Sequence, residues 1–372
     1  MAKVYVAGHI CLDIIPGLDR QVSALSEIFV PGTLTEIGPA VIATGGAVAN
    51  TGIALHRLGI ETTLMAKVGD DDFGRAIMRA LRRWCGDGPV SGMRVDPDVD
   101  TSYTVVVNSP GIDRLFLHCP GANHDFSADD MDCSKMEPGG LFHFGYPPLM
   151  RKMYREDGAE MKKIFERVRQ TGALTSLDMT RPDPSSESGQ VDWLSWLKNV
   201  LPSVDIFLPS IDEILYMVNR PEYDALVAKH GADHLMEGID AGLVRKTART
   251  LIEMGVSVAV IKLGDQGLYL QTGAKVPARG AEWAHADIFE PCYVAKVVGT
   301  TGAGDCAIAG FLAGFVKGMT PADTMHGGAG VASCSTESAD ATGAVPHWDE
   351  VWRRIMAGWG RLESRFIRGV LK

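Results

Sequence analysis

The segment at residues 298–310, VGTTGAGDCAIAG, combines small residues with one carboxylate in a pattern that suits phosphoryl transfer. Small residues at 302–304 lead into Asp305, and the apolar run at 306–316 predicts a buried helix. The free backbone N–H groups at the start of such a helix form an anion site. A carboxylate at this position would repel an anion. Its presence is explained if it removes a proton from a hydroxyl that attacks phosphorus. The alternative is a tight turn in which Asp305 caps the helix.

Composition and charge narrow the class of protein. The chain has 372 residues, 46% of them hydrophobic, which suffices for one large α/β domain with an appendage or for two domains. A net charge of -10, with both signs interspersed, argues against nucleic acid and anionic membranes as partners. The apolar runs are too short for a membrane span. With no visible signal peptide and seven scattered cysteines, we expect a cytoplasmic protein without a disulfide framework or zinc site.

Apolar periodicity predicts strands that alternate with helices. This alternation indicates a mostly parallel sheet with helices on both faces. Two further strands, joined by a Ser-Pro-Gly turn, form a predicted hairpin at 101–108 and 114–118. The stretch at 181–190 is expected to be an exposed loop, and the polar stretch at 220–242 an irregular insertion. The expected strands are 3–8, 62–68, 141–144, 174–178, 206–209 and 256–262, and the expected helices are 51–58, 73–84, 161–170, 211–218 and 244–254.

Polar residues and glycines follow several of the predicted strands. They lie at Asp13, 45–46, Asp178, 210–213 and 264–267. Because ligands in such sheets bind beyond the carboxyl ends of the strands, we expect these positions to converge on one site. The convergence is stronger evidence than any single motif.

These motifs together resemble the PfkB (ribokinase-like) carbohydrate kinases. TGGAVANTGIALHRLG at 44–59, followed by KVGDDDFG at 67–74, resembles one family signature, and GTTGAGD at 299–305 resembles the other. PGAN at 120–123 and KLGDQG at 262–267 lie between them in the family's order. The resemblance implies a doubly wound α/β fold with a small β-sheet lid. The main domain would comprise residues 1–13, 43–100 and 119–372, and the lid residues 14–42 and 101–118.

The resemblance also implies a role for each matching residue, with ATP as phosphoryl donor and Mg²⁺ as cofactor. Asp305 resembles the catalytic base, and Gly302, Ala303 and Gly304 resemble the anion hole. The residues that match the acceptor side are Asp13, Gly45, Gly46, Asn50, Asp178 and Arg181. Those that match the nucleotide side are Lys262, Gly264, Gly267 and Thr301. Glu213 resembles the family glutamate that organises Mg²⁺ through water.

Simpler interpretations of these residues remain open from the sequence. Asp13 could be a turn residue, and the glycines at 45–46 could serve a plain chain reversal. Asn50 could be a helix N-cap, and Glu213 a first-turn carboxylate that complements the helix dipole. The glycines at 264 and 267 could form a hairpin loop without a ligand.

The sequence departs from the family pattern at three positions. Ser210 replaces the usual Asn of NxxE, which puts the organisation of Mg²⁺ in doubt. Ala47 replaces a lysine common in ribokinases, which counts against ribose and phosphorylated sugars. Gly299 stands where potassium-activated members have Asp, so activation by a monovalent cation is doubtful.

The resulting hypothesis is transfer of the γ-phosphoryl group of ATP to a primary hydroxyl of a sugar or sugar-like polyol. No GxxxxGK[ST] motif is present, so amides and metal would replace the Walker lysine. One alternative is a nucleoside kinase that acts on a ribosyl 5′-hydroxyl, with Phe29, Tyr103 or Phe116 clamping the base. A second alternative is a non-catalytic sugar-binding or regulatory protein. The resemblance also implies pairing of lid edges between subunits, which would make a homodimer unless the insertion at 220–242 blocks or replaces that contact.

Overall fold

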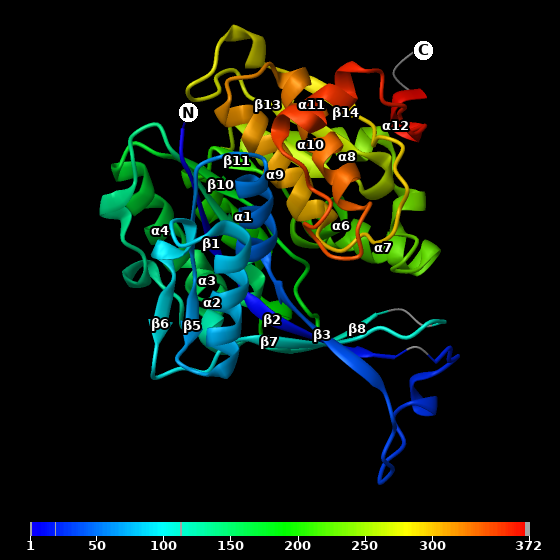
Figure 1. Ribbon diagram of the computed structural model, residues 1–372. Helices are drawn as coiled ribbons and strands as arrows, with labels where there is room; N and C mark the ends of the chain where they lie inside the picture. The colour runs from blue at the N-terminus through cyan, green and yellow to red at the C-terminus, as the bar shows by residue number, and fades with distance from the viewer. Residues whose placement is uncertain (1, 19, 112–113, 369–372) are drawn as a thin grey trace.

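The main body of the molecule is an eight-stranded sheet between two layers of helices (Figure 1). The computed structural model describes residues 2–18, 20–111 and 114–368. Within these residues, β13 alone runs opposite to the other strands of this sheet. The spatial order is β14 (Asp287–Glu290), β13 (Leu268–Thr272), β12 (Val258–Lys262), β11 (Ile206–Phe207), β10 (Leu174–Leu177), β9 (Leu141–Gly145), β1 (Val4–Gly8) and β4 (Thr62–Met65).

Helices cover both faces of the sheet, as the alternation predicted. Val4 and Val6 of β1 belong to the core on one face, and Tyr5 belongs to the core on the other. The first face packs against α1 (Ala47–Arg57), α2 (Asp72–Cys85), α9 (Ala303–Val316), α10 (Pro321–Ser335) and α11 (Trp348–Met356). The second packs against α3 (Arg151–Tyr154), α4 (Ala159–Gln170), α5 (Trp193–Val200), α6 (Ile211–Val218), α7 (Arg220–His230), α8 (Ala241–Glu253) and α12 (Arg365–Arg368).

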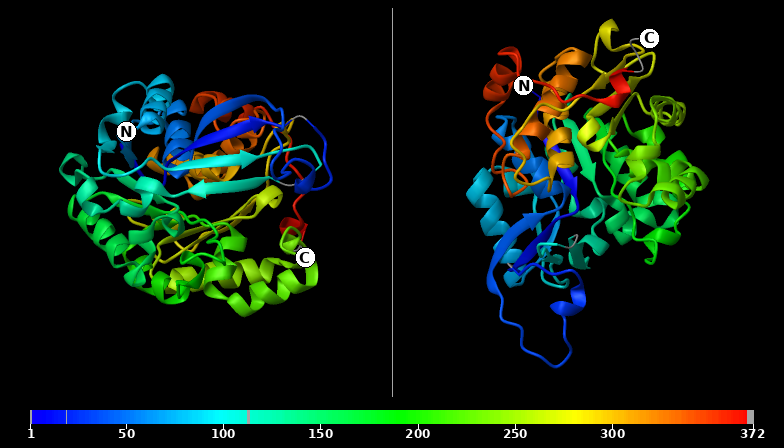
Figure 2. Two further views of the ribbon diagram at one scale, coloured as in Figure 1. Left: turned by 90° about the horizontal axis from the view of Figure 1, so that it is seen from below. Right: turned by 90° about the vertical axis from the view of Figure 1, so that its right-hand side faces the viewer.

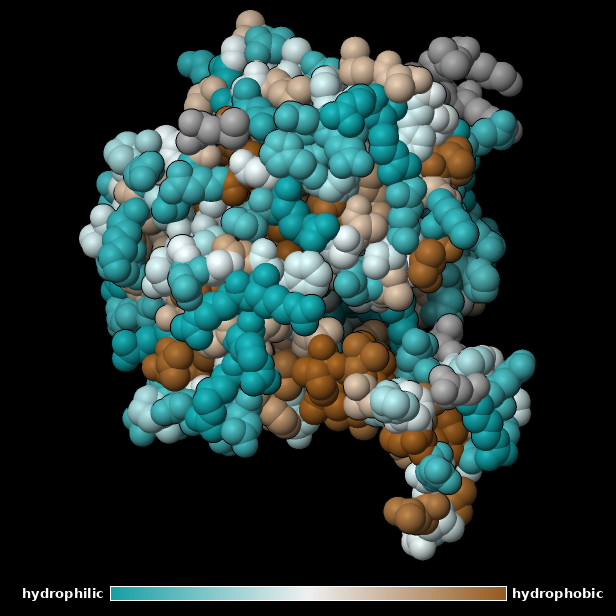
Figure 3. Space-filling model, in the orientation of Figure 1, coloured by the Kyte–Doolittle hydropathy of each residue, from teal (hydrophilic) through white to brown (hydrophobic). Residues whose placement is uncertain are grey.

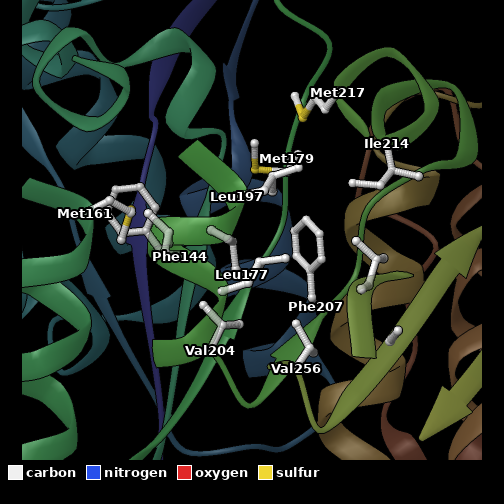
Figure 4. Close-up of a cluster of buried hydrophobic side chains, with 14 of the residues drawn as sticks. Phe144, Met161, Leu177, Met179, Leu197, Val204, Phe207, Ile214, Met217 and Val256 are labelled. Atoms are coloured by element: carbon white, nitrogen blue, oxygen red, sulfur yellow. The ribbon is translucent and has the colours of Figure 1, made fainter. Parts of the chain in front are cut away.

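The core on the second face joins successive strands to their covering helices. Phe144, Leu177 and Phe207 lie on three neighbouring strands and are fully buried against Leu197 of α5 and Met161 of α4 (Figure 4). Burying one such side chain contributes about 1.5–3 kcal/mol. This packing fixes the strand ends that carry the site.

A second sheet, which we call the lid, lies at one end of the main body. Its order is β3 (Gly38–Gly45), β2 (Cys11–Gly17), β7 (Tyr103–Val107) and β8 (Leu115–Cys119). β7 and β8 form the predicted antiparallel hairpin. The segment between β2 and β3 projects from the body (Figures 1 and 2).

The strands of the lid extend slightly beyond the predicted lid segments, because β2 begins at Cys11, β3 ends at Gly45 and β8 ends at Cys119. The domain limits themselves stay predictions. The predicted main domain and lid also include residues 1, 19, 112–113 and 369–372, which lie outside the described residues.

Two sequence predictions need correction. The strand expected at 62–68 is two strands, β4 and β5 (Lys67–Gly69), and β5 pairs with β6 (Arg94–Asp96) in a separate small sheet. The stretch at 220–242 is not irregular throughout: it contains α7, which ends at His230 and has Gly231 as its C-cap with φ 86°. Few apolar residues of α7 are buried, so its helical periodicity is weak in the sequence.

No helix among the described residues is both long enough and apolar enough to cross a membrane. All seven cysteines are unpaired thiols.

Candidate active site

The first turn of α9 forms the floor of the candidate site. Gly302 is its N-cap in the left-handed region (φ 72°), and a Cβ there would lie 2.4 Å from the Cβ of Ala341. Only glycine suits this position, because a side chain would be strained and would clash. The amide of Ala303 donates to the carbonyl of Thr300 (3.2 Å) and is therefore committed within the turn. The amides of Gly304 and Asp305 are the first-turn donors left to bind an anion.

The carboxylate of Asp305 is buried and accepts several hydrogen bonds. Its Oδ2 accepts from Asn50 Nδ2 at 2.9 Å, and its Oδ1 accepts from Thr51 Oγ1 at 3.4 Å. The hydroxyl of Tyr146 lies 2.9 Å from each of the two oxygens. Burial raises the pKa of Asp305, and these donors together with the Lys262 ammonium oppose that rise without cancelling it. A carboxyl with a raised pKa is a stronger base once it is ionised, which suits proton abstraction.

A largely buried lysine lies beside the first turn of α9. Lys262, the last residue of β12, donates from Nζ to Asp178 Oδ1 at 2.6 Å. The same Nζ lies 4.0 Å from the point that a Cβ on Gly304 would occupy. Burial lowers the pKa of Lys262, but the carboxylates of Asp178 and Glu213 outweigh it and the net pKa is raised. The site therefore places a permanent cation next to the free amides of the helix.

Asp178 and Glu213 are the carboxylates that surround this cation. Burial raises the pKa of both side chains, and the Lys262 charge only partly opposes it. Asp178 Oδ2 is buried without a hydrogen-bond partner. An unpartnered buried carboxylate oxygen is costly unless a ligand or ion satisfies it.

Glu213 combines two roles that the sequence left as alternatives. Its Oε2 accepts from the backbone N–H of Ser210 at 2.6 Å, so it caps the start of α6. It also lines the cavity described below. Ser210, which replaces the usual asparagine, is the N-cap residue of the same helix.

Replacing Glu213 with Gln should make the free protein's stability less dependent on pH. Because burial raises the folded-state pKa of Glu213, the folded state holds its proton more tightly than the unfolded chain does. The stabilising contribution is complete below the ordinary Glu pKa of about 4.3 and is lost as the pH rises through the raised pKa. Thermal unfolding between about pH 5 and pH 8 should therefore show wild type losing stability relative to Glu213→Gln. Asp212→Asn, in the same helical turn, is the control; a variant slope equal to that of wild type would refute the expectation.

The cavity above α9 has a volume of about 420 Å³ and collects residues from distant parts of the chain. Its size is within the range of small-molecule sites. The residues that the sequence predicted for it and that line it are Gly302, Gly304, Asp305, Glu213, Lys262 and Gly264. The others include Tyr146, Ser210, Asp212, Asp233 and Met236.

The two glycines of the KLGDQG motif do different things. Both have positive φ and lie in the turn between the antiparallel strands β12 and β13, so the hairpin interpretation is correct for the backbone. Gly264 faces the cavity, and a Cβ there would meet nothing within 4 Å. Gly267 instead packs on β14, because a Cβ would lie 2.0 Å from the carbonyl oxygen of Glu290.

The acceptor-side residues gather where the lid joins the main body. Asp13 lies within β2, so the turn interpretation is wrong. A Cβ on Gly45 would lie 2.3 Å from Asp13 Oδ2, and one on Gly46 would lie 2.6 Å from His9 Nδ1. Burial raises the pKa of Asp13, although hydrogen bonds from Cys11 and Thr104 oppose it. Glycines at 45–46 therefore make room for two polar side chains.

Three more predicted residues can be placed. Asn50 lies inside α1, whose N-cap is Gly46, so its interpretation as a helix cap is wrong. Arg181 does not line the cavity: it is exposed and donates from Nη1 to the Tyr223 hydroxyl at 3.1 Å. Thr301 is exposed outside the cavity and accepts a hydrogen bond from Arg114 of the lid hairpin.

Sequence reasoning missed several polar residues of the site. Tyr146 and Thr51 contact Asp305 directly. His9 follows β1, and its Nε2 lies 3.3 Å from the Nε2 of His118 on β8, which links the lid to the main sheet. Position along the chain could have identified two of them, because His9 and Tyr146 each come just after a strand, where a parallel sheet binds ligands.

The chain belongs to the pfkB family of carbohydrate kinases, because the family profile matches residues 1–348. It is a carbohydrate kinase, a phosphotransferase with an alcohol group as acceptor, as the motifs predicted. Fructokinase-1 of Zea mays is 28% identical over 299 residues, which cover 78% of this chain and 80% of that protein.

Solved structures share the ribokinase-like fold with its small lid sheet. Ribokinase from Thermotoga maritima superposes with a TM-score of 0.69 at 18% identity, covering 96% of this chain and 100% of that one. A putative ribokinase II from E. coli in complex with ATP and Mg²⁺ gives a TM-score of 0.68 at 19% identity, covering 96% and 100%.

Proposed function

We propose that this kinase transfers the γ-phosphoryl group of ATP to a primary hydroxyl of a sugar or sugar-like polyol, with Asp305 as general base. The observation that carries the proposal is the position of Asp305. Its carboxylate is buried in the first turn of α9, where free helix amides and the Lys262 ammonium form an anion site. One carboxylate can therefore act on an alcohol while the adjacent donors hold the transferring group.

Each group has a defined task in this reaction. Asp305 takes the proton of the acceptor hydroxyl as its oxygen attacks phosphorus. The amides of Gly304 and Asp305, with Lys262, stabilise the charge on the transferring phosphoryl oxygens. Asp13, Gly46 and Asn50 hold the acceptor, and Gly264 lets the nucleotide phosphates approach the backbone.

The carboxylates of the site fit a magnesium ion bound mainly through phosphates. Among the described residues, no three His, Cys, Asp or Glu side chains form a ready metal cage. Mg²⁺ in nucleotide sites needs only one or two carboxylates and keeps waters and phosphate oxygens as its other ligands. Glu213, which lines the cavity, is a suitable donor. The ion would neutralise negative charge on the phosphates.

The aromatic residues of the lid favour a sugar over a nucleoside. An aromatic clamp on the lid would favour a nucleoside as the acceptor. Tyr103 instead packs edge-on against Phe73 of α2, with ring centroids 5.3 Å apart. Phe29 and Phe116 are exposed and do not line the cavity. A non-catalytic sugar-binding role is disfavoured because Asp305 and the glycines around it are intact.

We also propose that the lid pairs with a second copy of the chain. Apolar side chains lie at the surface of the lid and its projecting segment (Figure 3), including Val41, Ile42, Phe116 and Leu117. Such a patch is a common sign of a protein contact. Light scattering at increasing concentration should show a dimer, and Phe116→Asp should shift it toward monomer. A monomer at every concentration would refute this proposal.

The acceptor can be identified by a coupled ADP-release screen over sugars, polyols, keto-acids and nucleosides. The proposal expects acceptor-dependent ADP release, together with a phosphorylated sugar or polyol detected by mass spectrometry. Turnover with nucleosides alone would favour the alternative substrate class. ATP binding without any product across the panel would favour the non-catalytic alternative.

A further inference from the structure

Tyr146 lies at the topological switch point of the main sheet. From β1, the chain continues to β4 on one side and later returns to β9 on the other, so the ends of β1 and β9 flank the switch. His9 follows β1 and Tyr146 follows β9, and their rings lie 6.1 Å apart. Ligands of open α/β sheets bind at such a crevice. Tyr146 therefore lies where an acceptor must pass or bind.

The backbone holds Tyr146 in an unfavourable conformation. It is in the left-handed region (φ 64°, ψ 44°), which is rare for an aromatic residue, and it precedes Pro147, which disfavours helical angles further. The residue before Tyr146 must be glycine, because a Cβ on Gly145 would lie 2.1 Å from the Cβ of Ala47. Strain of this kind persists where the surrounding structure imposes it, and it clusters at functional sites.

This strained residue aims its hydroxyl at the catalytic carboxylate. The hydroxyl lies 2.9 Å from both oxygens of Asp305, while Asn50 and Thr51 each contact one of these oxygens. A general base must lie about 2.6–3.2 Å from the hydroxyl whose proton it takes. The phenol group thus occupies the place that the acceptor hydroxyl needs. Burial and the Asp305 charge raise the pKa of Tyr146, so it stays protonated and donates.

We propose that Tyr146 is a gate on the catalytic base: its hydroxyl caps Asp305 in the free enzyme and leaves only when an acceptor hydroxyl replaces it. The inference rests on the proposed role of Asp305. Without the gate, a water molecule could take the same position, give its proton to Asp305 and attack the γ-phosphorus, so that ATP would yield ADP and phosphate. The gate therefore suppresses wasteful hydrolysis, which is a general task of closed kinase sites.

Tyr146→Phe tests the gate by removing one oxygen atom. Acceptor-free ADP release should rise about tenfold or more, and the KM for the acceptor should fall by a similar factor, because a hydrogen bond to a charged group is worth about a factor of ten or more. The kcat should change little, since the hydroxyl is absent from the reacting arrangement. Tyr5→Phe is a matched control: its hydroxyl also makes two hydrogen bonds, to the backbone of Lys135 and Glu137, away from this site.

A second substitution and a double variant complete the design. Tyr146→Leu removes the same hydroxyl with a different side chain and should also raise acceptor-free ADP release. Adding Asp305→Asn to Tyr146→Phe should return ADP release to background, because water would lose its base. Unchanged ADP release and an unchanged or higher acceptor KM in the folded Tyr146 variants would overturn the gate. So would elevated ADP release that persists in the double variant.

The outcomes separate the gate from the proposed function. Acceptor-free ADP release needs no substrate other than ATP, so it can be measured before the acceptor is known. If wild type phosphorylates an acceptor and the Tyr146 variants behave like wild type, the gate alone fails. If the Tyr146 variants hydrolyse ATP faster and no acceptor in the panel is phosphorylated by wild type, the assigned substrate class fails and the gate stands.

Discussion

Replacing Asp305 with Asn should slow phosphoryl transfer by about 10²–10⁴-fold, the usual contribution of a general base. Asparagine has nearly the same shape and can still pack against Asn50 and Thr51, but it cannot accept the proton of the acceptor. ATP affinity should stay equal or increase, because a negative charge beside the phosphates is removed. Single-turnover kinetics with the acceptor and calorimetric titration of ATP would measure the two effects separately.

Asp205→Asn is the matched control for loss of a buried carboxylate. Asp205 accepts hydrogen bonds from the backbone N–H and the hydroxyl of Thr175, at 2.9 and 3.0 Å, and does not line the cavity. Its substitution should lower thermal stability and leave the transfer rate of the folded enzyme close to that of wild type. Equal rate losses in both variants would mean that the Asp305 effect comes from folding rather than from chemistry.

Replacing Lys262 with Met should lower kcat by about 10²–10³-fold, the cost of losing one preorganised donor to a developing negative charge. Met keeps the length of the side chain but leaves the carboxylates of Asp178 and Glu213 without their neighbouring cation. The fold should lose about 3–5 kcal/mol, because one partner of a buried ion pair is removed. Stopped-flow kinetics and denaturant unfolding would measure the two losses.

A double variant separates the two roles of Lys262. Adding Asp178→Asn to Lys262→Met removes both members of the ion pair, so much of the stability should return. The rate should remain low, because the cation beside α9 is still missing. Recovery of both rate and stability in the double variant would show that Lys262 serves only to neutralise Asp178.

The sequence predicts the structure correctly where a single local segment determines it. The buried helix after Asp305 follows from an unbroken apolar run, and the small residues before it require a close approach of other atoms. The alternation of strands and helices predicted the layers of the main domain, and the Ser-Pro-Gly turn predicted the β7–β8 hairpin of the lid.

The contacts between distant segments could not be predicted. Lys262 and Asp178 meet although their strands, β12 and β10, are separated by β11. Tyr146 lies two residues beyond a predicted strand, where an aromatic residue is indistinguishable from a core residue. Its orientation depends on Gly145 packing against Ala47 of α1, which is a tertiary contact.

Weak local patterns explain two of the errors. Arg181 was predicted to face the acceptor, but its partner is Tyr223 on α7, in a stretch whose helix was not recognised. That helix buries only Tyr223 and Leu226, so its sequence carries little periodic signal. The segment that follows α7, around Asp233 and Met236, lines the cavity. The stretch at 220–242, which was expected to be irregular, therefore contributes to the site.

The most direct measurement is the single-turnover transfer of the γ-phosphoryl group to an accepted sugar by wild type and Asp305→Asn, followed across pH at saturating ATP and acceptor. Wild type should gain rate as the pH rises through the elevated pKa of Asp305, and the variant should be at least about a hundredfold slower without this dependence. A variant that matches wild type in rate and pH profile would contradict proton abstraction by Asp305.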